Sequence, residues 1–476
     1  MGPQPDRAKR PEVVKGFKVS GKRQISRGPD LQAENDLNIP GLPVRKTAAK
    51  LLAAIVDART PLDGLTDHEH GHPQFRALDM RDRSLVRAIL ITALRFRVSI
   101  GKLIARRLER PLPGNAHSLS HLLHVAAAQI LFLDIPDSAA VDLAVTHAKS
   151  DPRTARFAGL VNGLLRGLAR AKNHQLPKML ASTGDAPDWF IERLTVAYGD
   201  GRAHAILAAH RTEAPVDFTV KSDPEGWAEK LGGIVLPTGT VRVEQLAANV
   251  ADLPGYGDGA WWVQDAAAAL PARLLGDVAG LRVADLCAAP GGKTAQLVVA
   301  GADVTAVDAS KNRLARLAVN LDRLGLQAEI VQADIMEYQP EQLFDAVLLD
   351  APCSSTGTVR RHPDVPWTKS PEDVAKLAAL QRKLLGKALQ LVNPGGRLVF
   401  SNCSLDPLEG EALVEAMLGE TALATCDPIS AGEIDGIMPF ITADGLLRTT
   451  PADLDLGRPA ISGLDGFFAA RFRRAG

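Results

Sequence analysis

The sequence predicts a multidomain protein with an N-terminal all-α bundle, a small α/β connector and a C-terminal α/β domain of Rossmann-like type. Three observations support this prediction. The chain has 476 residues, which is too long for a single ordinary hydrophobic core. Apolar residues recur at helical spacing from Val44 onward. From Leu281, short apolar runs alternate with helical patterns, as in a parallel sheet covered by helices. We place the parts at 1–39 (a basic arm), 40–175, 186–258 and 259–476.

The overall composition excludes several classes of protein. Lys and Arg balance Asp and Glu at 55 each, so any attraction to an acidic partner must come from a local patch. The four cysteines form no CxxC pair, which argues against a zinc cage or a disulfide scaffold. No apolar run is long enough to span a membrane. We therefore expect a cytoplasmic protein, a monomer, with no metal and no membrane partner.

Residues 1–28 form the basic part of the arm. They carry eight Lys or Arg residues against only Asp6 and Glu12, with little apolar content. This composition predicts disorder. Two interpretations remain open, a solvated tail without a specific role and a non-specific contact with RNA phosphates.

Region 40–175 predicts a helical bundle. Gly41-Leu42-Pro43 marks the first helix start. Further helical patterns cover Arg81–Phe96, Ser118–Leu133, Ala139–Lys149 and Phe157–Ala171. The segment AVDLAVTHAKS, followed by FAGLVNGLLR, resembles the NusB family in the order and type of its residues. This resemblance implies a helical RNA-binding domain. A helical bundle with a purely structural role is the alternative.

Region 186–258 has a different character. The segment VDFTVK and Gly233–Leu236 alternate like short strands after a helix that opens near Trp189. Trp189 and Trp227 would suit contacts with RNA, but isolated aromatic residues at element ends usually belong to a core. We assign this connector no chemistry.

Region 259–476 predicts a sheet whose carboxyl edge carries the site. The expected strands end in polar residues at that edge, where open α/β sheets bind ligands. The strands are Leu281–Cys287, Ala302–Val307, Ala328–Val331, Phe344–Leu349 and Gly396–Ser401, with Gly466–Arg473 closing the sheet. The main helices between them are Lys311–Leu324 and Pro371–Val392.

The segment DLCAAPGGKT after the first strand predicts a cofactor loop. Gly291 and Gly292 allow a close backbone approach, and the next helix offers free N–H groups. The loop matches neither GxGxxG nor GxxxxGK[ST], which disfavours a phosphate-binding NTPase. Asp308 ends the second strand, where a doubly wound fold places an acid against ribose hydroxyls. Asp334 ends the third strand, where it can accept a bond from an adenine amino group, and Asp350 ends the fourth. The pattern fits an adenosine cofactor without phosphates, S-adenosylmethionine.

Two cysteines are expected at the same edge of the sheet. Cys353 lies in VLLDAPCSSTG, and Cys403 follows the strand GRLVFS. A lone cysteine is usually a small buried hydrophobe, but a pair facing a methyl donor has a specific use. A thiolate that adds to carbon 6 of cytosine activates carbon 5, and a second thiolate can remove the carbon-5 proton. Asp350 would hydrogen-bond ring nitrogen 3, whereas Lys293 either favours the thiolate or has a structural role.

The motifs DLCAAPGGKT, DAPCSSTG with VRRHPD and Trp367, and NCS at Cys403 resemble the RsmB/Sun (Fmu) family of ribosomal RNA cytosine-C5 methyltransferases, part of the NOL1/NOP2/Sun group. The resemblance implies a methyltransferase that forms 5-methylcytosine in small-subunit ribosomal RNA. It implies Cys403 as the nucleophile and Cys353 as the residue that releases the product. Gln264-Asp265 matches the family's entry helix, where the resemblance implies packing and cofactor support, and Asn402 stands where the family usually has Thr. The residues implied to bind S-adenosylmethionine are Cys287, Ala288, Ala289, Pro290, Gly291, Gly292 and Lys293, together with Asp308, Asp334 and Asp350.

Three alternatives accompany this prediction. Arg360 and Arg361 suit RNA phosphates, or they only fix their loop through carboxylates such as Asp364. An amino-group methyltransferase needs an Asp/Asn-Pro-Pro-aromatic loop, which DAPC contradicts. A non-catalytic RNA-binding assembly factor would have no need for two thiols at one sheet edge.

Overall fold

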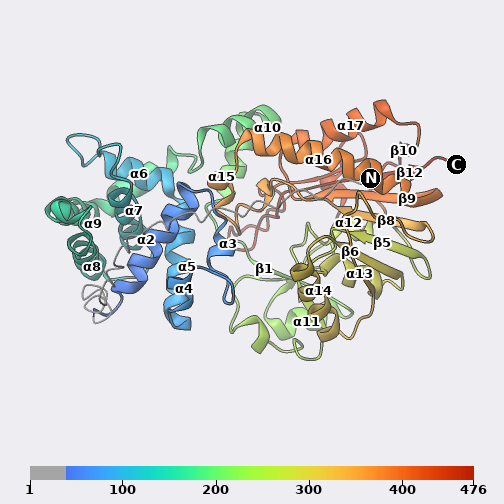
Figure 1. The fold of residues 1–476 in the computed structure, drawn as a ribbon, viewed down its shortest axis with the longest axis horizontal. Coiled ribbons are helices and arrows are strands. Elements are labelled where there is room, and N and C mark those ends of the chain that lie inside the picture. The colour runs from blue at the N-terminus through green and yellow to red at the C-terminus, as the bar shows by residue number, and fades with distance from the viewer. Residues whose placement is uncertain (1–38) are drawn as a thin grey trace, which may run out of the picture.

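The computed structural model describes residues 39–476, so the predicted basic arm lies outside the described residues except for Ile39. A helical domain stands at one end and a large sheet covered by helices at the other, with a small sheet between and below them (Figure 1). In the described part of the chain, no helix has the length and apolar character needed to cross a membrane.

The helical domain is built around α7 (His117–Phe132), whose residues from Leu119 to Leu131 are almost all buried. A helix that is apolar on nearly all sides must lie at the centre of its domain. The predicted helices are confirmed to within a few residues, although α9 runs past the expected boundary at 175 and α6 was not predicted. Around α7 lie α2 (Leu42–Val56), α5 (Met80–Arg95), α6 (Arg97–Ala105), α8 (Asp137–Ser150) and α9 (Ala158–Ala181), with the short α3 (Leu62–Leu65) and α4 (Pro73–Arg76).

The connector consists of α10 (Asp188–Ala209) and a small antiparallel sheet in the order β2-β3-β1-β4. The predicted strand at 216 is confirmed, but β4 pairs with it, so this sheet extends past the expected boundary at 258. Trp227 packs in the core of this sheet, and the Trp189 indole donates to Pro366 O at 3.2 Å. The bounds are β1 (Val216–Val220), α11 (Pro224–Leu231), β2 (Ile234–Val235), β3 (Val241–Val243) and β4 (Trp261–Val263).

The large sheet has the strand order β10-β12-β9-β8-β5-β6-β7. The five predicted parallel strands are confirmed, whereas the closing strand β12 pairs antiparallel with β9 and is not the edge, because β10 lies beyond it. The bounds are β5 (Arg282–Leu286), β6 (Asp303–Asp308), β7 (Glu329–Gln332), β8 (Phe344–Asp350), β9 (Val392–Asn402), β10 (Ala424–Cys426), β11 (Leu447–Thr449) and β12 (Phe467–Arg474).

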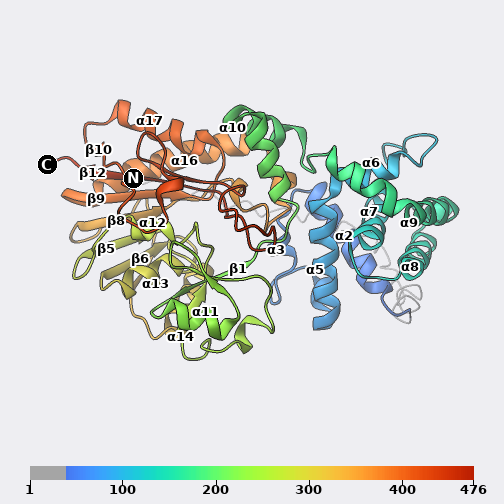
Figure 2. The same cartoon turned by 180° about the vertical axis from the view of Figure 1, so that it is seen from behind.

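Helices cover both faces of this sheet (Figures 1 and 2). On β8, Val347 and Leu349 pack in the core that includes α16 (Pro371–Gln390) and α17 (Glu411–Glu420). Ala346 and Leu348 pack in the opposite core, with α12 (Leu270–Arg273) and α13 (Gly292–Val299). Burial on both faces explains why this strand is a continuous apolar run. The last large helix, α14 (Lys311–Arg323), packs beside β6.

The loop after β8 joins the large domain to the helical domain. Arg95 of α5 donates to Arg360 O at 2.8 Å, and Trp367 donates to Leu94 O at 3.2 Å. The backbone N–H of Leu62 donates to Asp364 at 2.9 Å. The segment that begins at Cys353 therefore lies directly against the helical domain.

Candidate active site

Strands β8 and β9 are parallel neighbours, with Asp350 paired in register with Ser401. Each strand is followed within three residues by a cysteine. The structure places Cys353 Sγ 3.3 Å from Cys403 Sγ, and both side chains are partly buried. The expected proximity of the two thiols is confirmed.

The environments of the two thiols differ. The hydrogen bond between the two thiols raises the pKa of Cys353, and burial and the charge of Glu409 raise it further. The same bond lowers the pKa of Cys403, with further help from Ser355 and Lys293. Cys403 is therefore the thiol of the pair that is favoured to ionise. A thiolate is the nucleophilic form of cysteine.

Asp350 lies at the tip of β8 between two donors. Lys293 Nζ donates to Asp350 Oδ2 at 2.8 Å, and Ser401 Oγ donates to Oδ1 at 2.9 Å. Lys293 also lies over the Phe467 ring at 5.0 Å. Lys293 thus has both roles left open by the sequence, because it orients a carboxylate and adds positive charge beside Cys403.

Asp285 lies in β5, just before the loop that leads to α13, and it is fully buried. Thr294 Oγ1 donates to Asp285 Oδ2 at 2.6 Å, and Oδ1 has no hydrogen-bond partner among the described residues. Burial raises the pKa of Asp285 to about 7. Gly291 has φ +102° and caps α13, a conformation that favours glycine. Burial raises the pKa of Cys287 to about 12, so this third thiol is not a nucleophile at neutral pH.

Two further predicted acids follow β6 and β7. Asp308 accepts from the backbone N–H of Ala289 at 3.3 Å and of Ser310 at 2.9 Å, so it ties the β5 loop to the end of β6. Asp334 is exposed just beyond β7 and accepts from the N–H of Met336 at 2.9 Å. The acids Asp350, Asp308 and Asp334 therefore lie at the ends of the parallel strands β8, β6 and β7, at the edge of the sheet that carries the thiols.

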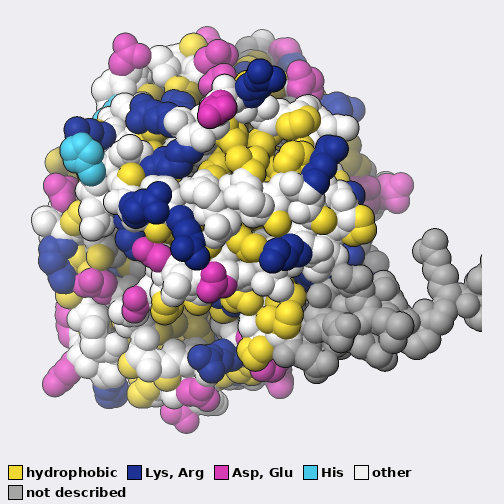
Figure 3. All heavy atoms as spheres, turned by 90° about the vertical axis from the view of Figure 1, so that its left-hand side faces the viewer, with side chains coloured by type: hydrophobic (Ala, Val, Ile, Leu, Met, Phe, Trp, Pro, Cys, Tyr) yellow, Lys and Arg dark blue, Asp and Glu magenta, His cyan; other side chains and the backbone are white. Residues whose placement is uncertain are grey.

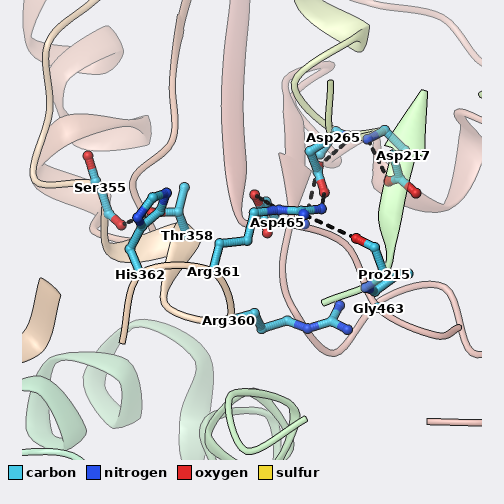
Figure 4. Close-up of polar contacts among 12 residues, drawn as sticks. Pro215, Asp217, Asp265, Ser355, Thr358, Arg360, Arg361, His362, Gly463 and Asp465 are labelled. Atoms are coloured by element: carbon cyan, nitrogen blue, oxygen red, sulfur yellow. Dashed lines mark hydrogen bonds and ion pairs between the residues drawn. The ribbon is translucent and has the colours of Figure 1, made fainter. Parts of the chain in front are cut away.

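Arg360 and Arg361 point inward (Figure 4). Arg361 donates to Asp265 at 2.8 Å, to Asp465 at 3.0 Å and to Pro215 O at 3.0 Å. Arg360 is only 2% exposed. These contacts favour the interpretation that Arg361 fixes the loop, through Asp265 and Asp465 and not through Asp364. Arg360 donates to Glu213 O at 3.4 Å. Their contact with RNA stays a prediction.

Gln264 does not belong to a helix, because residues 264 and 265 are irregular, residues 266–269 form turns and α12 starts at Leu270. Its Oε1 accepts from Trp262 Nε1 at 2.8 Å and from Thr219 Oγ1 at 2.8 Å. These bonds and the ion pair of Asp265 with Arg361 fit the implied packing role of Gln264-Asp265, although not in a helix, and its support of a cofactor stays a prediction.

Sequence reasoning missed Glu409 and Asp285. Glu409 is fully buried and accepts hydrogen bonds from the residues that follow the two thiols, Ser354 and Ser404. The sequence LDPLEGEA around Glu409 has the composition of an exposed helix start, so no local pattern marked it. For Asp285, the available signal was an acid inside a strand that is otherwise apolar.

The sheet order, the glycine-bearing loop after β5 and the acids that end the next strands define a Rossmann-like methyltransferase domain. A family model described as 16S rRNA methyltransferase RsmB/F matches residues 273–473, and one described as the NusB family matches 42–170. A "Ribosomal RNA small subunit methyltransferase B" of Salmonella arizonae is 34% identical over 397 residues, which cover 79% of this chain and 90% of that protein. The chain belongs to the RsmB/F methyltransferase family, with an N-terminal NusB domain.

Solved structures agree with this assignment. The crystal structure of PH0851 has a TM-score of 0.66 and 23% sequence identity, and it covers 92% of this chain and 99% of its own. At that identity, it supports the fold alone. A methyltransferase homologue from Pyrococcus horikoshii is 27% identical, with a TM-score of 0.50, and covers 59% of this chain and 93% of its own.

Proposed function

We propose that the protein transfers a methyl group from S-adenosylmethionine to carbon 5 of a cytosine in small-subunit ribosomal RNA. The observation that carries this proposal is the pair of thiols, 3.3 Å apart, beside the Lys293–Asp350 ion pair. A methyltransferase acting on a nucleophilic nitrogen has no use for two thiols, whereas carbon 5 of cytosine needs covalent activation. Membership of the RsmB/F family supports ribosomal RNA as the substrate class.

In this mechanism Cys403 acts as a thiolate and forms a bond to carbon 6 of the cytosine. Asp350, oriented by Lys293 and Ser401, accepts a hydrogen bond from protonated ring nitrogen 3 and stabilises the adduct. Bound S-adenosylmethionine supplies an electrophilic methyl group. Once the Cys403 sulfur is a thioether, its negative charge no longer opposes ionisation of Cys353. Cys353 then loses its own proton to water, and the resulting thiolate accepts the carbon-5 proton. The double bond between carbons 5 and 6 re-forms as the bond to Cys403 breaks, so that Cys403 leaves as a thiolate and ring nitrogen 3 returns its proton to water.

The residues after β5, β6 and β7 fit this cofactor. The left-handed turn at Gly291 opens the start of α13, where free N–H groups can receive a polar ligand. Asp334 is exposed, and the buried Oδ1 of Asp285 lacks a partner among the described residues. We assign the cofactor to Cys287–Lys293 with Asp308, Asp334 and Asp350.

We assign an RNA contact to α9 of the helical domain. Between Asp151 and Asp185 the chain contains no acid, and the exposed basic side chains there include Arg166 and Arg170. Figure 3 looks onto this end of the molecule, where basic side chains surround an apolar area. A basic face of this kind suits a phosphate backbone.

The test is methyl transfer with purified protein, methyl-labelled S-adenosylmethionine and small-subunit ribosomal RNA, followed by nucleoside mass spectrometry. We expect label in 5-methylcytidine, lost in Cys403→Ala. Label in another nucleoside would refute the carbon-5 chemistry. Tight RNA binding without transfer to naked RNA or to the small ribosomal subunit would leave the non-catalytic assembly factor as the better interpretation.

A further inference from the structure

One buried carboxylate joins the two cysteine loops. Glu409, in the turn Pro407–Glu409, accepts from the Ser354 N–H at 2.9 Å and from the Ser404 hydroxyl at 2.6 Å. The Ser354 hydroxyl donates to the same carboxylate. Ser354 follows Cys353 directly and Ser404 follows Cys403, so Glu409 contacts the residue next to each thiol.

Two amides complete this cluster. Gln381 of α16 donates to Glu409 Oε1 at 2.8 Å and to Pro352 O at 3.0 Å. Asn402 donates to Glu409 O at 2.6 Å and accepts from the Ser404 N–H at 3.0 Å. The ends of β8 and β9 are therefore fixed to each other through one acid and to α16 through one amide. Burial raises the pKa of Glu409, and the hydrogen bonds from Ser354, Ser404 and Gln381 oppose this shift by stabilising the ionised carboxylate.

Besides Glu409, the charged groups that act near the thiols or near Glu409 include Lys293, Asp350 and Arg193. Lys293 of α13 and Asp350 of β8 act on Cys403, with opposite effects on its ionisation. Glu409 acts on Cys353 and disfavours its thiolate. Arg193 of α10 interacts electrostatically with Glu409 but pairs with Asp406. Negative charge from Glu409 thus acts on Cys353, whereas Cys403 experiences the opposing charges of Asp350 and Lys293, of which Asp350 has the larger effect.

We propose that Glu409 is a positioning residue that sets the distance between the two thiols and selects Cys403 as the attacking one. The proposal rests on the proposed function, because it explains how two adjacent thiols take different roles in one reaction. Glu409 touches neither thiol through a hydrogen bond of its own. It acts through Ser354 and Ser404 and through its charge.

The test uses alkylation, which needs neither S-adenosylmethionine nor RNA. Wild type, Glu409→Gln and the control Glu415→Gln, which changes an exposed acid on α17, are treated briefly with iodoacetamide across a pH series. Peptide mass spectrometry then gives a separate pH profile for Cys353 and for Cys403. We expect Cys403 to react at lower pH in wild type and in Glu415→Gln. In Glu409→Gln we expect the rate ratio of Cys403 to Cys353 at pH 7 to fall about tenfold, equivalent to one pH unit.

Identical profiles in wild type and Glu409→Gln would overturn the electrostatic half of the proposal. Glu409→Asp tests the geometric half of the proposal, and it keeps the proposal testable if Glu409→Gln does not fold. The shorter side chain keeps the charge but retracts from Ser354 and Ser404. Diamide takes two electrons and two protons from the thiol pair and leaves a Cys353–Cys403 disulfide. We expect this disulfide to form severalfold more slowly in Glu409→Asp, with Cys403 still the first thiol to be alkylated.

A disulfide rate equal to that of wild type would overturn the geometric half. These outcomes are distinguishable from a failure of the proposed function. If the wild-type protein transfers no methyl group to RNA but the alkylation profiles depend on Glu409, the positioning stands and the methylation chemistry fails.

Discussion

Replacing Asp285 by asparagine tests the unusual burial of a carboxyl group beneath the cofactor loop. Asp285 is fully buried, and Thr294 donates to it at 2.6 Å. Asparagine has nearly the same shape, and its carbonyl oxygen can accept the same hydrogen bond. The substitution therefore removes a titratable group with little change in packing, and its effect on stability should depend on pH.

The size of this effect follows from the pKa. Burial raises the pKa of Asp285 from its ordinary value of 3.8 to about 7. Because the folded-state pKa is raised, the group's favourable contribution is complete below about pH 4 and is lost as pH rises to about 7. At about 1.4 kcal/mol per pH unit, the loss amounts to about 4 kcal/mol. The asparagine side chain does not titrate, so the stability of Asp285→Asn relative to wild type should rise by up to this amount between pH 4 and pH 8.

The assay is urea denaturation of both proteins at several pH values, with Asp303→Asn as a control for an exposed acid on β6. The difference in unfolding free energy between Asp285→Asn and wild type should increase with pH, whereas the control should stay within about 0.5 kcal/mol. A difference that is flat from pH 4 to pH 8 would refute the assignment of a raised pKa to Asp285.

Two further predictions concern the arginines. Arg361→Met leaves Asp265 and Asp465 buried without their partner, which should lower the unfolding free energy by about 3–5 kcal/mol in urea denaturation. Combining Arg166→Glu with Arg170→Glu should weaken RNA binding and lower the dependence of log K on log salt by about one per lost phosphate contact, measured by fluorescence anisotropy.

Each of these has a matched control. Arg316→Met breaks an exposed ion pair with Asp67 and should cost at most about 1 kcal/mol. An equal loss in both variants would contradict the view that the Arg361 cluster is a structural centre. Combining Arg76→Glu with Arg81→Glu gives the same charge change on α4 and α5. If that pair weakens RNA binding as much as the α9 pair does, the contact is not specific to α9.

The sequence predicts much of the fold because the spacing of apolar residues and the succession of strands and helices can be read from residues that are close together in the chain. The run from Val347 to Leu349 is apolar at every position because both faces of β8 are buried, and this marks a parallel strand. Once β8 and β9 are neighbours, Cys353 and Cys403 must emerge at one edge. The proximity of the two thiols was therefore predictable without a structure.

Other features depend on contacts between distant segments. The direction of β12 is set by its pairing with β9, which no local pattern encodes. Arg361 looks like a surface residue beside a catalytic loop, but its partners Asp265 and Asp465 come from two distant parts of the chain. Glu409 likewise becomes a buried acid only when α16 and both cysteine loops close around it.

The most direct test of the account is to trap the covalent adduct. Wild type, Cys353→Ala, Cys403→Ala and the double variant are incubated with S-adenosylmethionine and small-subunit ribosomal RNA, then run on a denaturing gel. The account predicts a persistent protein–RNA adduct in Cys353→Ala that disappears in the double variant and is absent in Cys403→Ala. An adduct that persists in Cys403→Ala, or none in any variant, would contradict attack by Cys403 and release through Cys353.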